Sequence, residues 1–151
     1  ALAICSKVAV MNNGTIHQCS SPSELIQFPK TSFVGRFALH RNILPAYINR
    51  NELITPIGNL PTEYSFQDGQ EFELLVDENS IEIDLSNNGF GVVEGREFLG
   101  DSWRIRILVG NILLRIFHQL ENPPCQGDKC NLIYKKGKNG IIFPGAKKIY
   151  F

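Results

Sequence analysis

Residues 91–118 read GVVEGREFLGDSWRIRILVGNILLRIFH, and this stretch decides the predicted fold. Apolar residues occupy every second position of 103–109, a period of two that places one side of a strand on a core. Gly110-Asn111 separates this run from a second β-prone run at 112–118, and glycine tolerates the positive φ of a two-residue hairpin loop. With a third run at 91–96, the stretch predicts a three-stranded antiparallel meander. Four glycines and many β-branched residues disfavour a helix here.

The composition is typical of a globular chain with no charge bias. Hydrophobic residues make up 43% of 151 residues and include ten Phe, enough for a sizeable core. The 15 basic and 15 acidic residues cancel, so no basic footprint indicates a nucleic-acid partner. No apolar run approaches the ~20 residues of a membrane span, and no secretory signal opens the chain. The first residues begin within an apolar pattern without an initiator Met, so we expect a fragment of a longer protein.

Four cysteines leave three interpretations open. Without a secretory signal, reduced thiols in a cytosolic protein are favoured. Cys125 and Cys130 form a C-x4-C pair that is compatible with zinc binding or with a disulfide, but a second closely spaced pair is missing. The remaining candidate ligands are scattered along the chain: Cys5, Cys19, His17, His40 and His118.

The first forty residues contain a hairpin and two helix signals. Asn12-Asn13-Gly14 is a turn between two short β-prone runs and predicts a β-hairpin at 7–19. Ser21 and Glu24 have the spacing of a capping box around Pro22, which predicts a helix at about 22–28. A second helix is expected at about 32–39, with Phe33 and Phe37 on one face that packs on a core.

After residue 42 the helical signals end and short β-prone runs recur. Clusters of Gly, Asn, Asp and Pro separate these runs at the spacing expected of a small β-sandwich or barrel. Residues 120–128 are predicted as a loop, and the basic cluster at 135–138 as a solvated turn, with an anion or RNA contact as the alternative. The predicted strands lie near 43–49, 52–57, 71–76, 80–85, 91–97, 103–109, 112–118, 128–134, 140–143 and 147–151.

Residues 6–45 carry the motifs of a known family. The segment SKVAVMNNGTIHQ at 6–18 resembles the last β-hairpin of the ATPase subunit of ABC importers, where an apolar strand ends in Met-x-x-Gly-x-Ile-x-Gln. Ser6-Lys7 departs from the usual Asp-Arg pair, and Ser20 stands where a Gly is frequent. The segments that follow match in order and spacing: PSELI at 22–26, Pro29, FVGRF at 33–37 and NILP at 42–45.

Residues 42–151 resemble the transport-associated OB-type domain that follows the ATPase in these importers. LLV at 74–76 with IEI at 81–83 is similar to its Leu-Leu-Val-Arg-Pro-Glu-x-Ile segment, except that Asp77 and Glu78 replace the Arg-Pro. This reversal of charge predicts that no anion binds there. GVV at 91–93 and FLGD at 98–101 also match. In GDKCNL at 127–132, Cys130 takes an apolar strand position, which favours an ordinary buried thiol.

No catalytic motif occurs in the sequence. A nucleotide-hydrolysing site requires a phosphate-binding G-x-x-x-x-G-K-[ST] loop and a metal-binding carboxylate, and this loop does not occur in the sequence. The hydrolase motif G-x-S-x-G and the zinc-protease motif H-E-x-x-H are also absent. In the family resembled, the catalytic elements all precede the equivalent of Ala1. We therefore assign no catalytic, cofactor-binding or metal-binding residue to this chain and expect it not to be an enzyme by itself.

The resemblance implies a mainly β fold, an OB-like antiparallel barrel or sandwich at 42–151, preceded by an ATPase-domain remnant at 1–41. It implies a C-terminal regulatory and dimerisation region whose intact parent uses ATP and Mg²⁺ to drive solute import. The implied partners are a second copy of itself and membrane permease subunits, on the cytoplasmic face of the cell membrane. The solute expected is ferric iron or an inorganic anion.

A different class of function is a free-standing OB-type module that binds small anions or oligonucleotides. The zero net charge and the lack of an evident aromatic platform argue against nucleic acid.

Overall fold

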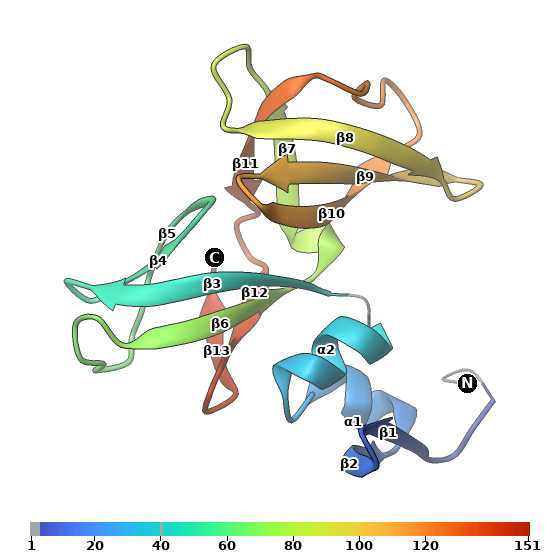
Figure 1. The fold of residues 1–151 in the computed structure, drawn as a ribbon, viewed down its shortest axis with the longest axis vertical. Helices are drawn as coiled ribbons and strands as arrows, with labels where there is room; N and C mark the ends of the chain where they lie inside the picture. Colours follow the sequence, from blue (N-terminus) through green and yellow to red (C-terminus); the bar gives the residue numbers. More distant parts are fainter. Residues whose placement is uncertain (1–3, 40) are drawn as a thin grey trace.

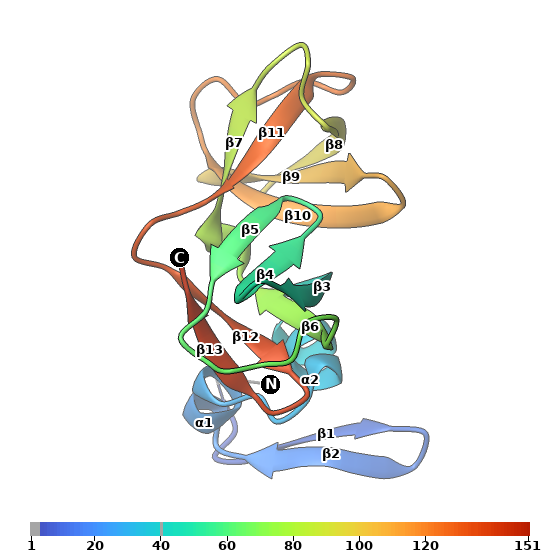
Figure 2. The same cartoon turned by 90° about the vertical axis from the view of Figure 1, so that its left-hand side faces the viewer.

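The computed structural model describes residues 4–39 and 41–151, without the side chains of residues 37–39. The chain is mainly β, with antiparallel sheets, one of which curls into half a barrel, and two short helices, which confirms the predicted fold class. A five-stranded sheet lies at one end, a six-stranded sheet in the middle, and the hairpin with both helices at the other end (Figures 1 and 2). No helix among the described residues is long and apolar enough to cross a membrane.

The five-stranded sheet contains the predicted meander. Its strand order is β10-β9-β8-β11-β7, and consecutive strands β8, β9 and β10 pair antiparallel as expected. Gly110 adopts φ +60 in the tight turn between β9 and β10. The bounds are β7 Ile81–Leu85, β8 Gly91–Phe98, β9 Ser102–Val109, β10 Ile112–Gln119 and β11 Lys129–Tyr134, with a 3₁₀ turn η1 at Glu78–Ser80 before β7.

The six-stranded sheet collects strands from both ends of the β region. Its order is β13-β12-β6-β3-β4-β5, so the last hairpin of the chain pairs with β6 beside β3. The strand predicted near 52–57 is present as β4 but ends at Thr55, where the chain turns and returns in β5, a strand that was not predicted. The bounds are β3 Asn42–Asn49, β4 Glu52–Thr55, β5 Gly58–Pro61, β6 Glu71–Val76, β12 Asn139–Phe143 and β13 Lys147–Tyr150.

One apolar core lies between the two sheets. It includes Leu44 and Leu74 from the six-stranded sheet and Ile107 and Ile116 from the five-stranded sheet, all fully buried. Alternation along each strand supplies these side chains, since every second residue points to the same face. At ~25 cal/mol per Å² of buried apolar surface, this shared core is the main stabilising contribution of the β region.

Polar side chains link the two sheets beside the core. The Asn42 carboxamide of β3 donates to the Arg115 carbonyl at 2.7 Å and accepts from the Arg115 N–H at 2.9 Å on β10. The Thr55 hydroxyl donates to the Gly58 carbonyl at 2.6 Å, so the Tyr134 hydroxyl, also at 2.6 Å, donates to Thr55. Burial raises the pKa of Tyr134.

The N-terminal segment follows the predictions closely. Strands β1 (Val8–Asn12) and β2 (Thr15–Ser20) form the expected hairpin. Helix α1 (Pro22–Gln27) begins at the predicted capping box, since Ser21 accepts from the Glu24 N–H and Glu24 accepts from the Ser21 N–H.

Helix α2 (Ser32–Leu39) is the second predicted helix. Of its two aromatic residues, Phe33 packs on His17 with ring centroids 4.6 Å apart, while the Phe37 side chain lies outside the described part of the structure.

Candidate functional site

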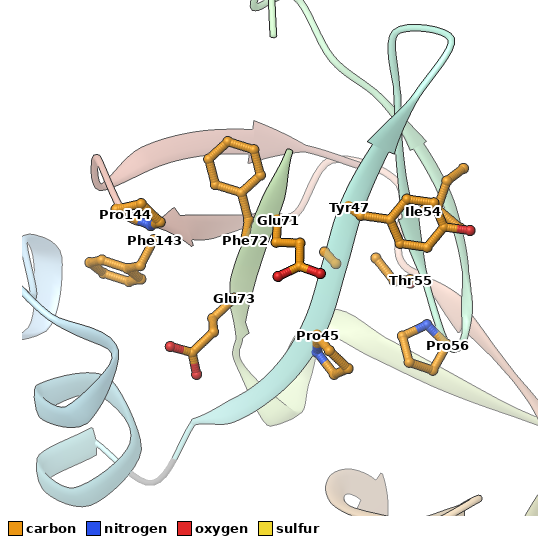
Figure 3. Close-up of a pocket in the computed structure, with 11 residues that line it drawn as sticks. Pro45, Tyr47, Ile54, Thr55, Pro56, Glu71, Phe72, Glu73, Phe143 and Pro144 are labelled. Atoms are coloured by element: carbon orange, nitrogen blue, oxygen red, sulfur yellow. The ribbon is translucent and has the colours of Figure 1, made fainter. Parts of the chain in front are cut away.

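An apolar hollow lies on the outer face of the six-stranded sheet, and we call it the outer groove (Figure 3). Its volume is about 700 Å³, within the range of small-molecule sites. The strands β3, β4 and β6 form its floor, and the end of β12 forms one wall. It is lined by Pro45, Ala46, Tyr47, Ile54, Thr55, Pro56, Glu71, Phe72, Glu73, Phe143 and Pro144.

Strand register places the groove side chains in two rows. Glu71 of β6 is opposite Tyr47 of β3, and Tyr47 is opposite Ile54 of β4. In the next row, Glu73 lies between Phe143 of β12 and Pro45 of β3. The period of two that sends Leu44 and Leu74 into the core sends these residues outward.

Helix α2 sets the boundary of the groove. It covers the third row of the same face, where Leu75 is buried against Gly35. A Cβ at Gly35 would lie 2.6 Å from Leu75 Cδ1, so an alanine here would force the buried Leu75 side chain to shift. At the helix start, the Ser32 hydroxyl donates to Glu73 Oε1 at 3.2 Å. The first two rows continue beyond the helix, and the groove is the part of the face that α2 leaves open.

The electrostatics of the groove are one-sided. Glu71 and Glu73 are exposed carboxylates, and no Lys, Arg or His is among the described residues that line it. Tyr47 is 47% exposed, and its ring extends over β4 toward Ile54, away from the Glu71 carboxylate (Figure 3). The two carboxylates give the groove a negative charge beside apolar side chains.

A second hollow, of about 630 Å³, is lined by arginines. Arg36, Arg41 and Arg115 surround it where α2 and β3 approach β10. Arg41 is already engaged, because it donates to the Ile26 carbonyl at 2.9 Å and lies 3.9 Å from Asp77. This arginine therefore ties α1 to the end of β6.

The two carboxylates that replace the family's Arg-Pro both lie beside arginines. Asp77 is near Arg41, and Glu78 of η1 accepts from Arg104 of β9 at 2.8 and 3.3 Å. The hydrogen bond to Glu78 raises the pKa of Arg104. Asp77 and Glu78 thus serve as internal partners of basic residues.

The cysteines do not come together. Cys130 lies on β11 in the core, which confirms its apolar strand position, and burial raises the pKa of its thiol. Cys125 is exposed, and both are free thiols rather than a disulfide. Among the described residues, no group of three or more His, Cys, Asp or Glu could hold a metal ion.

The predicted turns are in place. Residues 120–128 form an irregular connection, and Lys136-Gly137 forms the turn of the basic cluster at 135–138, with φ +87 at Gly137.

The hairpin and α1 expose an apolar surface. Met11, Ile16 and Phe28 are each more than half exposed, and Met11 and Ile16 are direct cross-strand partners. Large exposed apolar groups of this kind mark interaction surfaces. Sequence reasoning identified the hairpin but not the outer groove, because Glu71 and Glu73 read as the solvent face of an ordinary strand.

The chain is similar to known proteins of one kind. The chain is similar to ATP-binding subunits of ABC importers, which confirms the resemblance found in its motifs. No protein-family model matches the chain.

Three relatives illustrate the similarity. The chain is 28% identical over 128 residues to the spermidine/putrescine import ATP-binding protein PotA of Mesomycoplasma hyopneumoniae, covering 80% of this chain and 29% of that protein. The PotA of Protochlamydia amoebophila is 23% identical over 171 aligned positions, 99% of this chain and 46% of that protein. The Fe(3+) ions import ATP-binding protein FbpC 2 of Rhizobium meliloti is 30% identical over 125 residues, covering 71% of this chain and 31% of that protein. The chain spans less than half the length of each.

Proposed function

We propose that this chain is the C-terminal regulatory and dimerisation region of an ABC-importer ATP-binding subunit. The observation that carries the proposal is the similarity to importer subunits over 99% of the chain in one relative, while only 46% of that relative is covered. The remainder of such a protein would supply the phosphate loop and metal-binding carboxylate that this sequence lacks. The intact parent would use ATP and Mg²⁺, and this part would bind neither.

The partners follow from the same proposal. A second copy of the subunit and membrane permease subunits would surround this region, on the cytoplasmic face of the membrane. Such a contact would bury the exposed apolar side chains of Met11, Ile16 and Phe28.

For the solute, we propose a cation. The relatives are named for spermidine and putrescine or for Fe(3+), all of which are positively charged. Ferric iron, one of the two solutes expected from the sequence, stays within this class, and an inorganic anion does not.

The proposal is tested on the native protein. Antibodies against this chain should detect a protein well above the mass of 151 residues, in a membrane fraction that also contains permease subunits. That protein should hydrolyse ATP, while titration of the 151-residue chain with Mg-ATP should give no saturable heat. A native protein no larger than this chain would overturn the proposal and favour a free-standing binding module. Micromolar ATP binding to the chain alone would contradict the proposal that ATP is bound only by the remainder of the parent protein.

A further inference from the structure

The turn of the N-terminal hairpin contains an asparagine followed by a glycine, a pair that can modify itself without an enzyme. The glycine backbone nitrogen, after losing its proton to solvent hydroxide, attacks the side-chain carbonyl carbon of the asparagine. The new C–N bond closes a five-membered succinimide ring, and the side-chain nitrogen leaves as ammonia. Water then opens the ring at either carbonyl and gives aspartate or isoaspartate. Glycine favours the attack because it has no side chain and its backbone rotates freely.

The chain contains three such pairs, at Asn13-Gly14, Asn88-Gly89 and Asn139-Gly140. All three asparagines are exposed to solvent. Because the dipeptide and the exposure are the same, the surroundings of each glycine decide how easily the ring closes. Closure requires the backbone to rotate at the pair, and a hydrogen bond or a close neighbour at the glycine opposes this rotation.

Two of the pairs are held in place by the β region. Gly140 is buried in β12, pairs with β6 on one side and β13 on the other, and would place a Cβ 2.8 Å from Leu74 Cδ1. The Gly89 N–H donates to the Ser86 carbonyl at 2.9 Å, and a Cβ at Gly89 would clash with the Cys130 backbone. Rotation at either pair therefore requires part of the packed sheets to open.

The pair in the hairpin has none of these restraints. Gly14 is exposed, and apart from its chain neighbours no atom lies within 4 Å of the place where it would carry a Cβ. Within the described residues, its N–H has no hydrogen-bond partner. The turn is at the end of the hairpin that points away from α1 (Figure 2). A two-stranded hairpin is marginally stable by itself, so this end can open while the β region stays folded.

From these observations we propose that Asn13 is the site at which this chain deamidates, and that its isoaspartate form disrupts the hairpin turn. Asn13 has φ +49 and Gly14 has φ +76, the left-handed conformations of a two-residue turn that pairs Asn12 with Thr15. Isoaspartate adds a methylene group to the backbone, so the two strands can no longer meet in this register.

The modification acts on the exposed apolar surface of the hairpin. Met11 and Ile16 are cross-strand partners next to the turn, and both are more than half exposed. A longer backbone in the turn changes how these two side chains are presented, and the new carboxylate adds a negative charge beside them. Deamidation therefore alters the surface of the hairpin and leaves the core between the sheets unchanged.

The test is peptide mapping by mass spectrometry of the whole chain, incubated in dilute solution at mildly alkaline pH with and without urea. In urea the three pairs should react at similar rates, because they share the same dipeptide. In the folded chain we expect Asn13 to react at least about tenfold faster than Asn88 or Asn139. Equal rates at the three pairs in the folded chain would overturn the proposal. So would an unreacted Asn13 after a time in which the chain in urea has deamidated.

Asn13→Gly is the matched control, because glycine adopts the positive φ of the turn but cannot deamidate. Isoaspartyl methyltransferase should label the incubated native chain and leave the incubated control unlabelled. Equal labelling of both would place the reaction at another residue and overturn the site. Amide chemical shifts of residues 8–20 should change in the isoaspartate form and stay constant in the incubated control. Unchanged shifts in the isoaspartate form would contradict the effect on the turn.

Discussion

In the β region, Leu44, Leu74 and Ile107 are fully buried between two sheets, whereas in the N-terminal segment Met11 and Ile16 are more than half exposed on a two-stranded hairpin. Both regions have regular hydrogen bonding, caps and turns. The difference is that eleven strands share one core in the first, while in the second two short helices pack on the hairpin and leave Met11 and Ile16 exposed. Correct local structure is therefore no measure of how much a segment contributes to stability.

The largest expected effect separates the two regions directly. Leu74→Ala removes a fully buried side chain and should lower the free energy of unfolding by about 2–5 kcal/mol. Met11→Ala, at a 57% exposed position, should change it by less than about 0.5 kcal/mol. Urea denaturation followed by circular dichroism measures both. Similar losses for the two variants would show that the hairpin has a buried partner in solution.

The contact between the regions is the next target. Gly35→Ala gains about 1 kcal/mol in helix propensity but forces a methyl group against buried Leu75, and overpacking costs about 1–3 kcal/mol. We expect a net loss of up to about 2 kcal/mol in the stability of α2, measured by amide hydrogen exchange. In a Leu75→Ala background the same substitution should become stabilising. If Gly35→Ala is destabilising by the same amount in both backgrounds, the Leu75 contact is not its cause.

A smaller effect tests the polar link between the sheets. Tyr134→Phe removes the hydrogen bond to Thr55, which keeps its own bond to Gly58, so the loss should be about 0.5–1.5 kcal/mol. Tyr150→Phe, at an exposed tyrosine, should cost almost nothing.

The Tyr134 variant also changes the dependence of stability on pH. Burial raises the pKa of Tyr134 in the folded chain, so above the ordinary tyrosine pKa of about 10 the unfolded chain ionises first. The unfolded state then binds fewer protons than the folded state, and stability falls as the pH rises above about 10. Tyr134→Phe should flatten this decline relative to Tyr150→Phe. Parallel curves for the two variants would mean that Tyr134 ionises as easily when folded.

The smallest change in stability accompanies a change in assembly. The exposed hairpin is expected to seek a partner, so the chain should self-associate through it, since paired strands with open edges and apolar side chains are prone to this. Deletion of residues 1–20, or Ile16→Ser with Met11→Ser, should shift light scattering toward the monomer. A monomer at high concentration with the hairpin intact would contradict self-association through the hairpin. A dimer unaffected by the deletion would place the contact in the β region.

The sequence was most informative where a local rule acts alone. Ser21 and Glu24 predicted the start of α1, and Gly110-Asn111 predicted the turn of the meander, because capping and tight turns depend on a few neighbouring residues. The strand predicted at 52–57 ends at Thr55, because Pro56 and Ile57 form a turn. The returning strand at 58–61, GNLP, was missed because it has little β propensity and is held by pairing with β4.

The candidate site was less predictable than the fold. Glu71 and Glu73 alternate with Phe72 and Leu74, a pattern that fixes the strand and its faces but says nothing of what lies opposite. The groove exists because β12, nearly seventy residues later, brings Phe143 beside Glu73, and because α2 stops short of the first two rows. Long-range pairing of this kind has no local signature.

Asn42 has a further consequence for how the molecule behaves in a crowded solution. Strand β10 is an outer strand of its sheet, and an uncovered strand edge is a template on which another chain can add a strand; here β3, η1 and β7 lie close to β10. The Asn42 carboxamide occupies both backbone groups of Arg115, near the middle of that edge, and is itself only 5% exposed. An incoming strand would have to displace two short hydrogen bonds before it could propagate past this point. The buried Asn42 side chain therefore hinders the addition of a strand from another chain along β10.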